Sequence, residues 1–155
     1  MKVYVGTYSK YNSGSLKGDW LDIEGYVDQE DFLTACAKLH EDEDDAEFMF
    51  QDQEGIPGCF FCESQIDKEL WDMIKEADDL DEAIAYVYHH NEWDSNKFDE
   101  SKRGKWDSDK EFIQDLIDNT ETIPEWLEGY IDWDAMTKDY MHDFVESNGY
   151  YFLTL

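Results

Sequence analysis

The stretch VYVGTYSKYNSGSLKGDWLDI, residues 3–23, decides how the chain begins to fold. Its first six residues are mostly β-branched and aromatic, which predicts a strand over 3–8. Turn-forming residues follow at 10–14, and the alternating segment LKGDWLDI predicts a second strand over 16–23. We therefore expect the chain to open with a small antiparallel sheet.

Residues 28–39 place apolar side chains at helical spacing, with Asp28 as the candidate N-cap. After an acidic run, residues 46–53 have the composition of a third strand. These elements predict an N-terminal sheet-plus-helix unit that spans residues 1–62.

The next part of the chain, residues 63–105, is predicted to be mainly helical. Apolar residues at i, i+4, i+7 and i+8 spacing predict one amphipathic helix over 66–77 and another over 80–88. Polar residues dominate 91–105, which predicts a loop or loosely packed linker that carries much of the positive charge.

The last third contains three predicted helices. The first spans 108–118, a short one starts at Pro124 with Thr122 as its candidate cap, and a longer one spans 132–146.

The chain is predicted to end on a strand over 150–153, after a turn at Asn148 and Gly149. Residues 106–155 therefore form a C-terminal α+β unit. The expected fold class is α+β and elongated, with a small antiparallel-sheet-plus-helix unit, a helical middle, and C-terminal helices with a short sheet.

The charge of the chain is its most unusual property. Forty Asp and Glu face twelve Lys and Arg, which gives a formal net charge of −28. Solubility requires a magnitude of only about 2–8 for a small domain, and excess charge opposes compactness through self-repulsion. Aromatic residues make up 16% of the chain, which is unlike a disordered acidic tail. We therefore expect a folded protein whose acidity serves a function.

Duplex DNA supplies a length scale for this charge. It carries one charge per roughly 1.7 Å of axis, so −28 corresponds to roughly 48 Å, or about 14 base pairs. A compact globule of this length is about 38 Å across. A modestly elongated fold would match the linear charge density of DNA.

The acidic residues concentrate in three segments with few basic neighbours. Stabilising helix pairs place Glu four residues before Lys, whereas here most such partners are acidic or apolar. An ordinary solvated face would mix both signs. The carboxylates that we expect to mimic phosphates are Glu41, Asp42, Glu43, Asp44, Asp45, Glu47, Asp67, Glu69, Asp72, Glu76, Asp79, Glu82, Glu111, Asp115, Asp118, Glu121, Glu125, Glu128 and Asp132.

A halophilic surface would also account for the acidity, without any acidic function, and the salinity at which the host grows would test it. Arg103 is the only arginine. Because guanidinium groups are preferred for phosphate recognition, we expect the protein itself to bind no nucleic acid.

The sequence contains few candidates for catalysis. Cys59 and Cys62 form a CxxC, but a second pair of zinc ligands is missing nearby. His89 and His90 are adjacent and point in different directions on a helix, which disfavours a shared metal. No phosphate-binding loop, GxSxG, GxGxxG or EF-hand pattern occurs. We expect no enzyme activity, no catalytic or metal site, and no cofactor.

Residue composition also suggests a compartment. No stretch approaches the roughly 20 apolar residues that span a bilayer, and the first residues lack the core of a signal peptide. Three cysteines do not suit a disulfide framework. We expect a cytoplasmic protein that does not associate with membranes.

Both ends of the chain resemble the ArdA antirestriction proteins. Near the N-terminus the pattern KYN-x-G-x-L-x-G-x-W is present at Lys10, Tyr11, Asn12, Gly14, Leu16, Gly18 and Trp20. The segment IPEWLEGYIDWDAMTKDYM, residues 123–141, is similar to the antirestriction motif of the family, and GYYFLTL to its last strand. Trp133, Met136 and Lys138 depart from the family pattern, where Tyr, Tyr and Arg are expected.

The resemblance implies an elongated, three-part α+β protein that forms a homodimer through its C-terminal part. Such dimers imitate bent B-form DNA and fill the cleft of the specificity and modification subunits of type I restriction–modification enzymes. The family occurs on mobile genetic elements of prokaryotes. The motif and expected dimer interface comprise Pro124, Leu127, Tyr130, Ile131, Asp132, Trp133, Ala135, Met136 and Asp139.

Two functions stay open besides DNA mimicry. An acidic immunity-type protein would sequester one basic nuclease, and a carboxylate-based or metal-dependent hydrolase would use two specific acids. The apolar residues of the motif also fit the core side of an ordinary capped helix.

Overall fold

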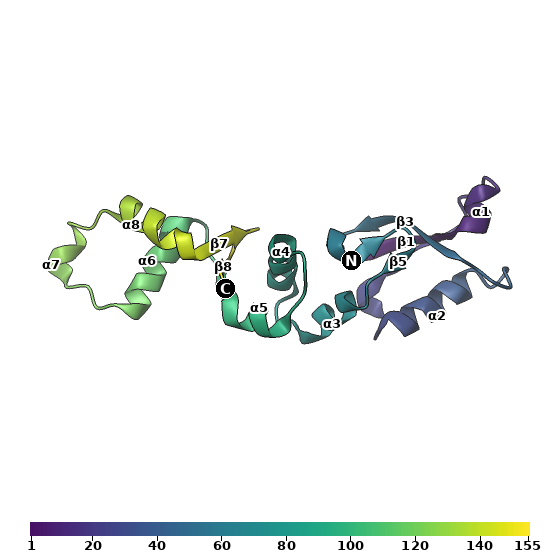
Figure 1. Ribbon diagram of the computed structural model, residues 1–155, viewed down its shortest axis with the longest axis horizontal. Helices are drawn as coiled ribbons and strands as arrows, with labels where there is room; N and C mark the ends of the chain where they lie inside the picture. Colours follow the sequence, from purple (N-terminus) through teal and green to yellow (C-terminus); the bar gives the residue numbers. More distant parts are fainter. The chain divides into compact units, whose positions relative to one another are not determined.

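The computed structural model describes all residues, 1–155, and has a mixed α+β fold (Figure 1). The chain divides into two compact units, residues 1–80 with 91–93 and residues 81–90 with 94–155. The three-part organisation with boundaries at 62 and 105 stays a prediction. None of the helices is both long and apolar enough to cross a membrane.

The first unit is built on a three-stranded antiparallel sheet. β1 (Lys2–Thr7) lies between β2 (Asp19–Asp22) and β3 (Phe48–Glu54). Val3 pairs with Leu21 on one side and with Gln53 on the other. The three strands predicted in this part of the chain are confirmed, although β2 is shorter than expected.

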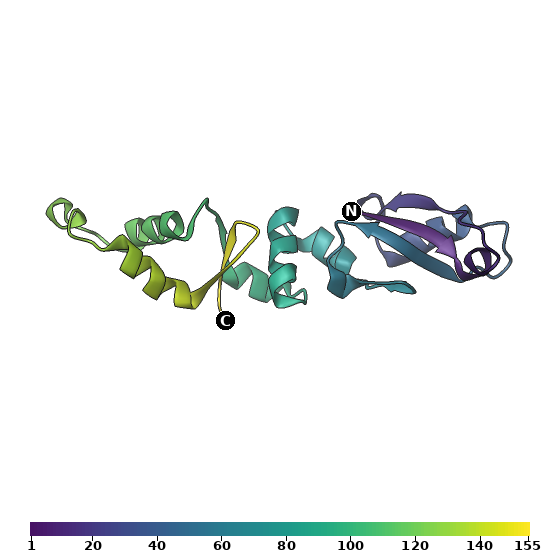
Figure 2. The same cartoon turned by 90° about the horizontal axis from the view of Figure 1, so that it is seen from above.

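Helices connect the strands of this unit. α1 (Tyr8–Asn12) replaces the first part of the predicted turn, and the 3-10 helix η1 (Ile23–Gly25) follows β2. α2 (Gln29–Leu39) starts at Asp28, whose side chain accepts a hydrogen bond from the Asp31 N–H at 2.9 Å, as predicted. This helix covers one face of the sheet (Figure 1; Figure 2) and buries Phe32 and Cys36.

The first unit ends with a small hairpin and a helix. A 3-10 turn, η2 (Gly58–Phe60), leads into β4 (Phe61–Cys62), which pairs with β5 (Gln65–Ile66). α3 (Glu69–Glu76) therefore starts later than the predicted helix over 66–77, because Ile66 is taken up by the hairpin.

The prediction of a loop or linker over 91–105 is wrong for residues 95–105, which form a helix and a strand. α4 (Leu80–His90) is followed by α5 (Ser95–Ser101) and β6 (Lys102–Lys105). The Asp94 side chain caps α5 by accepting from two backbone N–H groups. Phe98 is 2% exposed, and its ring lies 5.5 Å from that of Tyr86. One buried aromatic residue and a helix cap thus order a segment that is polar on average.

The sheet of the second unit has the order β6-β8-β7. β7 (Phe144–Ser147) and β8 (Tyr150–Leu153) form a hairpin whose turn residues, Asn148 and Gly149, both have positive φ. The helix predicted over 132–146 is therefore too long. α8 (Trp133–Tyr140) ends in the 3-10 helix η3 (Met141–Asp143), because Val145 pairs with Phe152 across the hairpin.

α6 (Asp109–Thr120) supplies most of the core beside this sheet. It is capped by Ser108, and its residues Phe112, Ile113 and Ile117 form a cluster with Tyr151. α8 lies alongside α6 (Figure 2). The short helix α7 (Glu125–Glu128) lies between them in the chain. Thr122 is not its cap, since Pro124 occupies the N-cap position and no side chain caps the helix.

Candidate functional site

All nineteen candidate carboxylates reach the surface. Sixteen belong to exposed residues, and only Glu43, Asp67 and Glu82 are partly covered. Leaving aside Asp79 and Glu82, the candidates that form an ion pair with a basic side chain are Asp42 and Glu43. Most candidates are thus available to groups outside the chain.

The acidic segment, residues 41–47, connects α2 to β3 and is held by two lysines. Lys10 Nζ lies 2.8 Å from Asp42 Oδ1 and 3.0 Å from Glu43 Oε1, and Lys17 Nζ lies 2.9 Å from Asp42 Oδ2. Hydrogen bonds from Lys10 and then Lys17 lower the pKa of Asp42 well below its ordinary value. Those from Lys10 and Thr7 lower the pKa of Glu43. The sequence shows no basic residue beside this segment, so the tertiary fold supplies the compensation.

One group of side chains in this segment has the spacing of metal ligands. His40, Asp42 and Glu43 bring one ligand atom each within 4.8 Å of one another. However, Lys10 Nζ lies 2.8 Å from His40 Nδ1 as well as from Asp42. Since the lysine ammonium already satisfies all three groups, we assign this cluster to a lysine network and not to a metal site.

The candidate acids of α3 and α4 partly serve the backbone. Asp67 accepts a hydrogen bond from a backbone N–H at the start of α3, at 3.0 Å. Glu76 accepts from the indole of Trp93 at 2.9 Å, and Glu82 accepts from the Gly104 N–H at 3.1 Å. Asp67 and Glu76 are therefore held in place by neutral donors, which leave their negative charge intact.

α6 presents an acidic face made of Glu111, Asp115 and Asp118. Their i, i+4, i+7 spacing places them on one side of the helix, and all three are exposed without a basic partner. Glu111 also accepts from the Asp107 N–H at 3.2 Å, and its own N–H donates to Ser108 Oγ. This face is therefore ordered by local capping hydrogen bonds and not by an ion pair with a lysine.

The motif-like segment 123–141 divides into an inward and an outward part. Trp133 and Met136 pack against the α6 core, and the Asp132 side chain caps α8 by accepting from the Ala135 N–H at 3.0 Å. By contrast, the side chains around α7 are exposed. Trp126 is 73% and Tyr130 83% exposed.

We call the exposed group Trp126, Leu127 and Tyr130 the α7 apolar surface. Ile131 is partly covered, while Pro124, Ala135 and Asp139 are exposed.

The chain was compared with models of protein families and with curated proteins. A family model described as antirestriction protein (ArdA) matches residues 3–152, which is nearly the whole chain. The chain belongs to the ArdA antirestriction family. A search of curated proteins returned no match.

The residues of the N-terminal family pattern have structural roles in this ArdA chain. A Cβ at Gly18 would collide with the Val5 carbonyl oxygen and the ring of Tyr4. The Tyr4 hydroxyl donates to the Leu16 carbonyl at 2.9 Å, and its ring meets Trp20 edge-on at 5.6 Å. This pattern therefore holds the connection between β1 and β2 against the sheet.

The CxxC of this ArdA chain lies at the β4–β5 hairpin. Cys59 is partly buried, which raises the pKa of its thiol, while a hydrogen bond with Ser64 lowers the pKa of the exposed Cys62. Neither cysteine belongs to a group of three potential metal ligands. The hairpin offers a free thiol at the surface and no further chemistry.

Sequence reasoning missed two features that the structure shows. Lys10 was noted only for the predicted turn and for the family pattern, and its position against the acidic segment depends on contacts 32 residues apart. Trp126 was not among the predicted interface residues. Its i+4 spacing to Tyr130, in a stretch that also contains Leu127, was the available signal.

Proposed function

We propose that this protein is a non-catalytic DNA mimic that inhibits type I restriction–modification enzymes. Its surface carboxylates take the place of DNA phosphates in the cleft formed by the modification and specificity subunits. The observation that carries this proposal is that the candidate acids are exposed and, for the most part, lack a cation within the chain. Membership of the ArdA family supports it.

The energetics follow from the arrangement of charge. Exposed, unpaired acids repel one another and lower the stability of the free protein. A cleft lined with Lys and Arg removes that repulsion and steers association. Because each contact is screened and weak, no single acid should decide binding. Affinity should fall steeply with added salt, as it does for DNA itself.

The same proposal includes a homodimer formed through the C-terminal part. The α7 apolar surface supports it, since large aromatic side chains are enriched in the cores of protein interfaces. Two copies would carry twice the charge, or the equivalent of about 28 base pairs by the spacing of phosphates in DNA. Double substitution Trp126→Ala with Tyr130→Ala should convert the dimer to a monomer in sedimentation experiments, with the helix content unchanged.

The proposed setting is the cytoplasm of a prokaryotic host that receives the gene on a mobile element. There the protein would act by occupying its target, without a cofactor and without covalent chemistry.

A gel-shift competition tests the proposal directly. A type I modification complex is bound to its labelled DNA site, and the protein is added at increasing concentration. We expect displacement of the DNA at a protein concentration comparable to that of the enzyme, and weaker displacement at higher salt. No displacement at any salt concentration, with tight binding to a single basic nuclease instead, would support the immunity-type function.

Grouped charge neutralisation tests whether the mimicry is distributed. Asp115→Asn alone should change inhibition little, whereas Glu111→Gln, Asp115→Asn and Asp118→Asn together should weaken it clearly. Complete loss of inhibition from one Asp→Asn substitution would contradict distributed mimicry.

A further inference from the structure

The acidic segment, residues 41–47, is tied to the first unit at both of its ends. At its start, His40 is 1% exposed, and its Nε2 atom lies 3.1 Å from the Val5 carbonyl oxygen. At its end, the Tyr8 N–H donates to the Glu47 carbonyl at 3.1 Å. The segment is therefore a closed loop whose two ends are held by β1 and α1.

Lys10 holds the middle of this loop. Its Nζ atom lies 2.8 Å from Asp42 Oδ1 and 3.0 Å from Glu43 Oε1, and the same atom lies 2.8 Å from His40 Nδ1. The Thr7 side chain is fully buried, and its hydroxyl donates to Glu43 Oε1 at 2.8 Å. Because the Lys10 side chain is only 12% exposed, its ammonium is held more firmly than that of an ordinary surface ion pair.

The remaining four acids of the loop are available to a partner. Glu41, Asp44, Asp45 and Glu47 are exposed, and none of their side chains forms an ion pair or a hydrogen bond within the chain. They lie on both sides of the two acids that Lys10 holds. Six carboxylates in so short a loop repel one another, so an internal cation is needed to keep these four in a defined arrangement.

We propose that Lys10 is a positioning residue for inhibition, because it holds the acidic segment in the shape that a basic partner recognises. The identity of that partner rests on the proposed function. A surface that is ordered before binding loses less conformational entropy when it binds, and carboxylates at fixed positions can match the Lys and Arg side chains across an interface. A lysine inside the protein thus strengthens binding to a partner that is itself positively charged.

A partner that responded only to charge would show the opposite effect. Lys10→Met removes one positive charge, which takes the formal net charge from −28 to −29, and it frees two carboxylates. Charge alone would therefore make this variant a better inhibitor. If the arrangement of the acids matters, the loop of the variant spreads under its own repulsion, and the variant inhibits less despite its extra charge.

Lys17 separates the holding of the loop from the neutralisation of an acid. It lies 2.9 Å from Asp42 Oδ2, but its side chain is 61% exposed, and it contacts neither Glu43 nor His40. Lys17→Met leaves the Lys10 contacts in place. This variant should therefore inhibit at least as well as the wild type.

The test is a gel-shift competition between the full chain and the labelled DNA site of a type I modification complex. For half displacement of the DNA, Lys10→Met should require roughly fivefold more protein than the wild type. Lys38→Met is the matched control for charge, because it removes an exposed lysine of the same unit that makes no ion pair. It should require no more protein than the wild type.

Two further measurements respond to the position of the acids and not to stability alone. The slope of log affinity against log salt concentration reports the number of ion pairs with the partner. It should be smaller for Lys10→Met, whereas a variant that is only less stable keeps the slope of the wild type. Amide exchange over 41–47 should be faster. Thr7→Val removes the hydrogen bond to Glu43 without a change of charge, and it should shift both measurements in the same direction by less.

Inhibition by Lys10→Met that equals or exceeds that of the wild type would overturn the proposal. So would amide exchange over 41–47 that stays unchanged, or a loss of inhibition in Lys17→Met or Lys38→Met as large as that in Lys10→Met. If the wild type displaces no DNA at any salt concentration, the proposed function fails, and the role of Lys10 in inhibition fails with it. The two failures are distinguishable, because in the first case the wild type still inhibits.

Discussion

The acidic segment at 41–47 and the acidic face of α6 look alike in sequence, but the fold treats them differently. Lys10 and Lys17 hold the inner acids of the segment, Asp42 and Glu43, through three short contacts, and Lys10 also contacts the His40 ring. The acids on the α6 face have no basic partner. The comparison teaches that the density of acids along a chain does not tell which of them are available to a partner.

The two regions also owe their order to different causes. The segment is ordered by tertiary ion pairs, whereas the α6 face is ordered by the Ser108 cap and by the packing of Phe112 on Tyr151. Substitutions that remove each cause should separate the regions, with effects that fall from the buried aromatic core to the exposed acids.

Phe112→Ala should have the largest effect and act on the α6 region. The ring is 1% exposed and stacks on Tyr151 at 4.5 Å between centroids. Its loss should lower the free energy of unfolding by about 4 kcal/mol, measured by urea denaturation. Phe112→Leu keeps most of the volume and should cost about 1 kcal/mol. Equal losses for both variants would show that the cluster is loosely packed.

Lys10→Met should have the next largest effect and act on the acidic segment. The Lys10 side chain is only 12% exposed and donates to three groups, so its removal takes one donor from each of them. We expect a loss of about 2 kcal/mol and faster amide exchange over 41–45. Lys17→Met removes a 61% exposed partner and should cost much less. A similar cost for the two lysines would contradict the difference in burial.

The effect of Lys10→Met should depend on pH. Because Asp42 and Glu43 have lowered pKa values in the folded state, their stabilisation is present above the unfolded values of 3.8 and 4.5. It is lost as the pH falls through the folded values. The difference in stability between wild type and Lys10→Met should stay constant from about pH 7 to 5 and shrink below about 4.5. A difference that grows in acid would reverse the assigned sign.

Ser108→Ala should act on the α6 face alone. The hydroxyl accepts from the Glu111 N–H at 3.2 Å, and loss of an N-cap costs about 1 kcal/mol. Circular dichroism during thermal unfolding measures the change. Ser108→Asp keeps an acceptor and serves as the control, with stability close to that of the wild type.

Asp115→Asn with Asp118→Asn should have the smallest effect on stability. These acids pair with nothing and repel their neighbours, so we expect a change within about 0.5 kcal/mol, in the stabilising direction at low salt. Urea denaturation at two salt concentrations measures it. Clear destabilisation at low salt would mean that these acids, like Asp42, have a partner within the fold.

Local features of the fold were predictable because their causes lie close together in the sequence. Asp28 and Ser108 cap helices that begin where their spacing predicts. The failures occurred where distant pairing decides the outcome. Val145 is in a strand because it meets Phe152, and Lys102 is in β6 because it pairs with the same residue.

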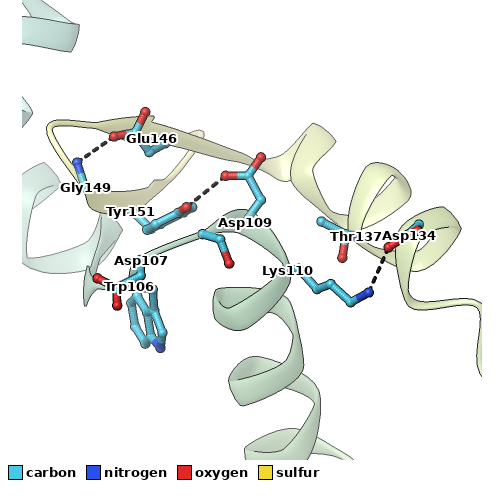
Figure 3. A pocket seen from close by; sticks show the side chains of 10 residues that line it. Trp106, Asp107, Asp109, Lys110, Asp134, Thr137, Glu146, Gly149 and Tyr151 are labelled. Carbon is cyan, nitrogen blue, oxygen red and sulfur yellow. Dashed lines mark hydrogen bonds and ion pairs between the residues drawn. The ribbon is translucent and has the colours of Figure 1, made fainter.

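The candidate site was predictable in part for the same reason. Carboxylates are costly to bury, so their exposure follows from residue type. Which acids are paired does not follow from type, as Asp42 and Asp115 illustrate. A pocket at the start of α6, lined by residues up to 45 positions apart such as Trp106 and Tyr151, could not be foreseen either (Figure 3).

By itself, the sequence determined that the protein is folded, strongly acidic and mixed α+β, and its two ends resemble the ArdA family. These properties depend on composition and on spacing within a single element. The tertiary structure alone decided that Lys10 compensates the acidic segment, that the acids of α6 stay unpaired, and that Trp126 is exposed while Trp133 packs against the core. The physical reason is that compensation and burial depend on which distant side chains the fold brings within a few ångströms of one another.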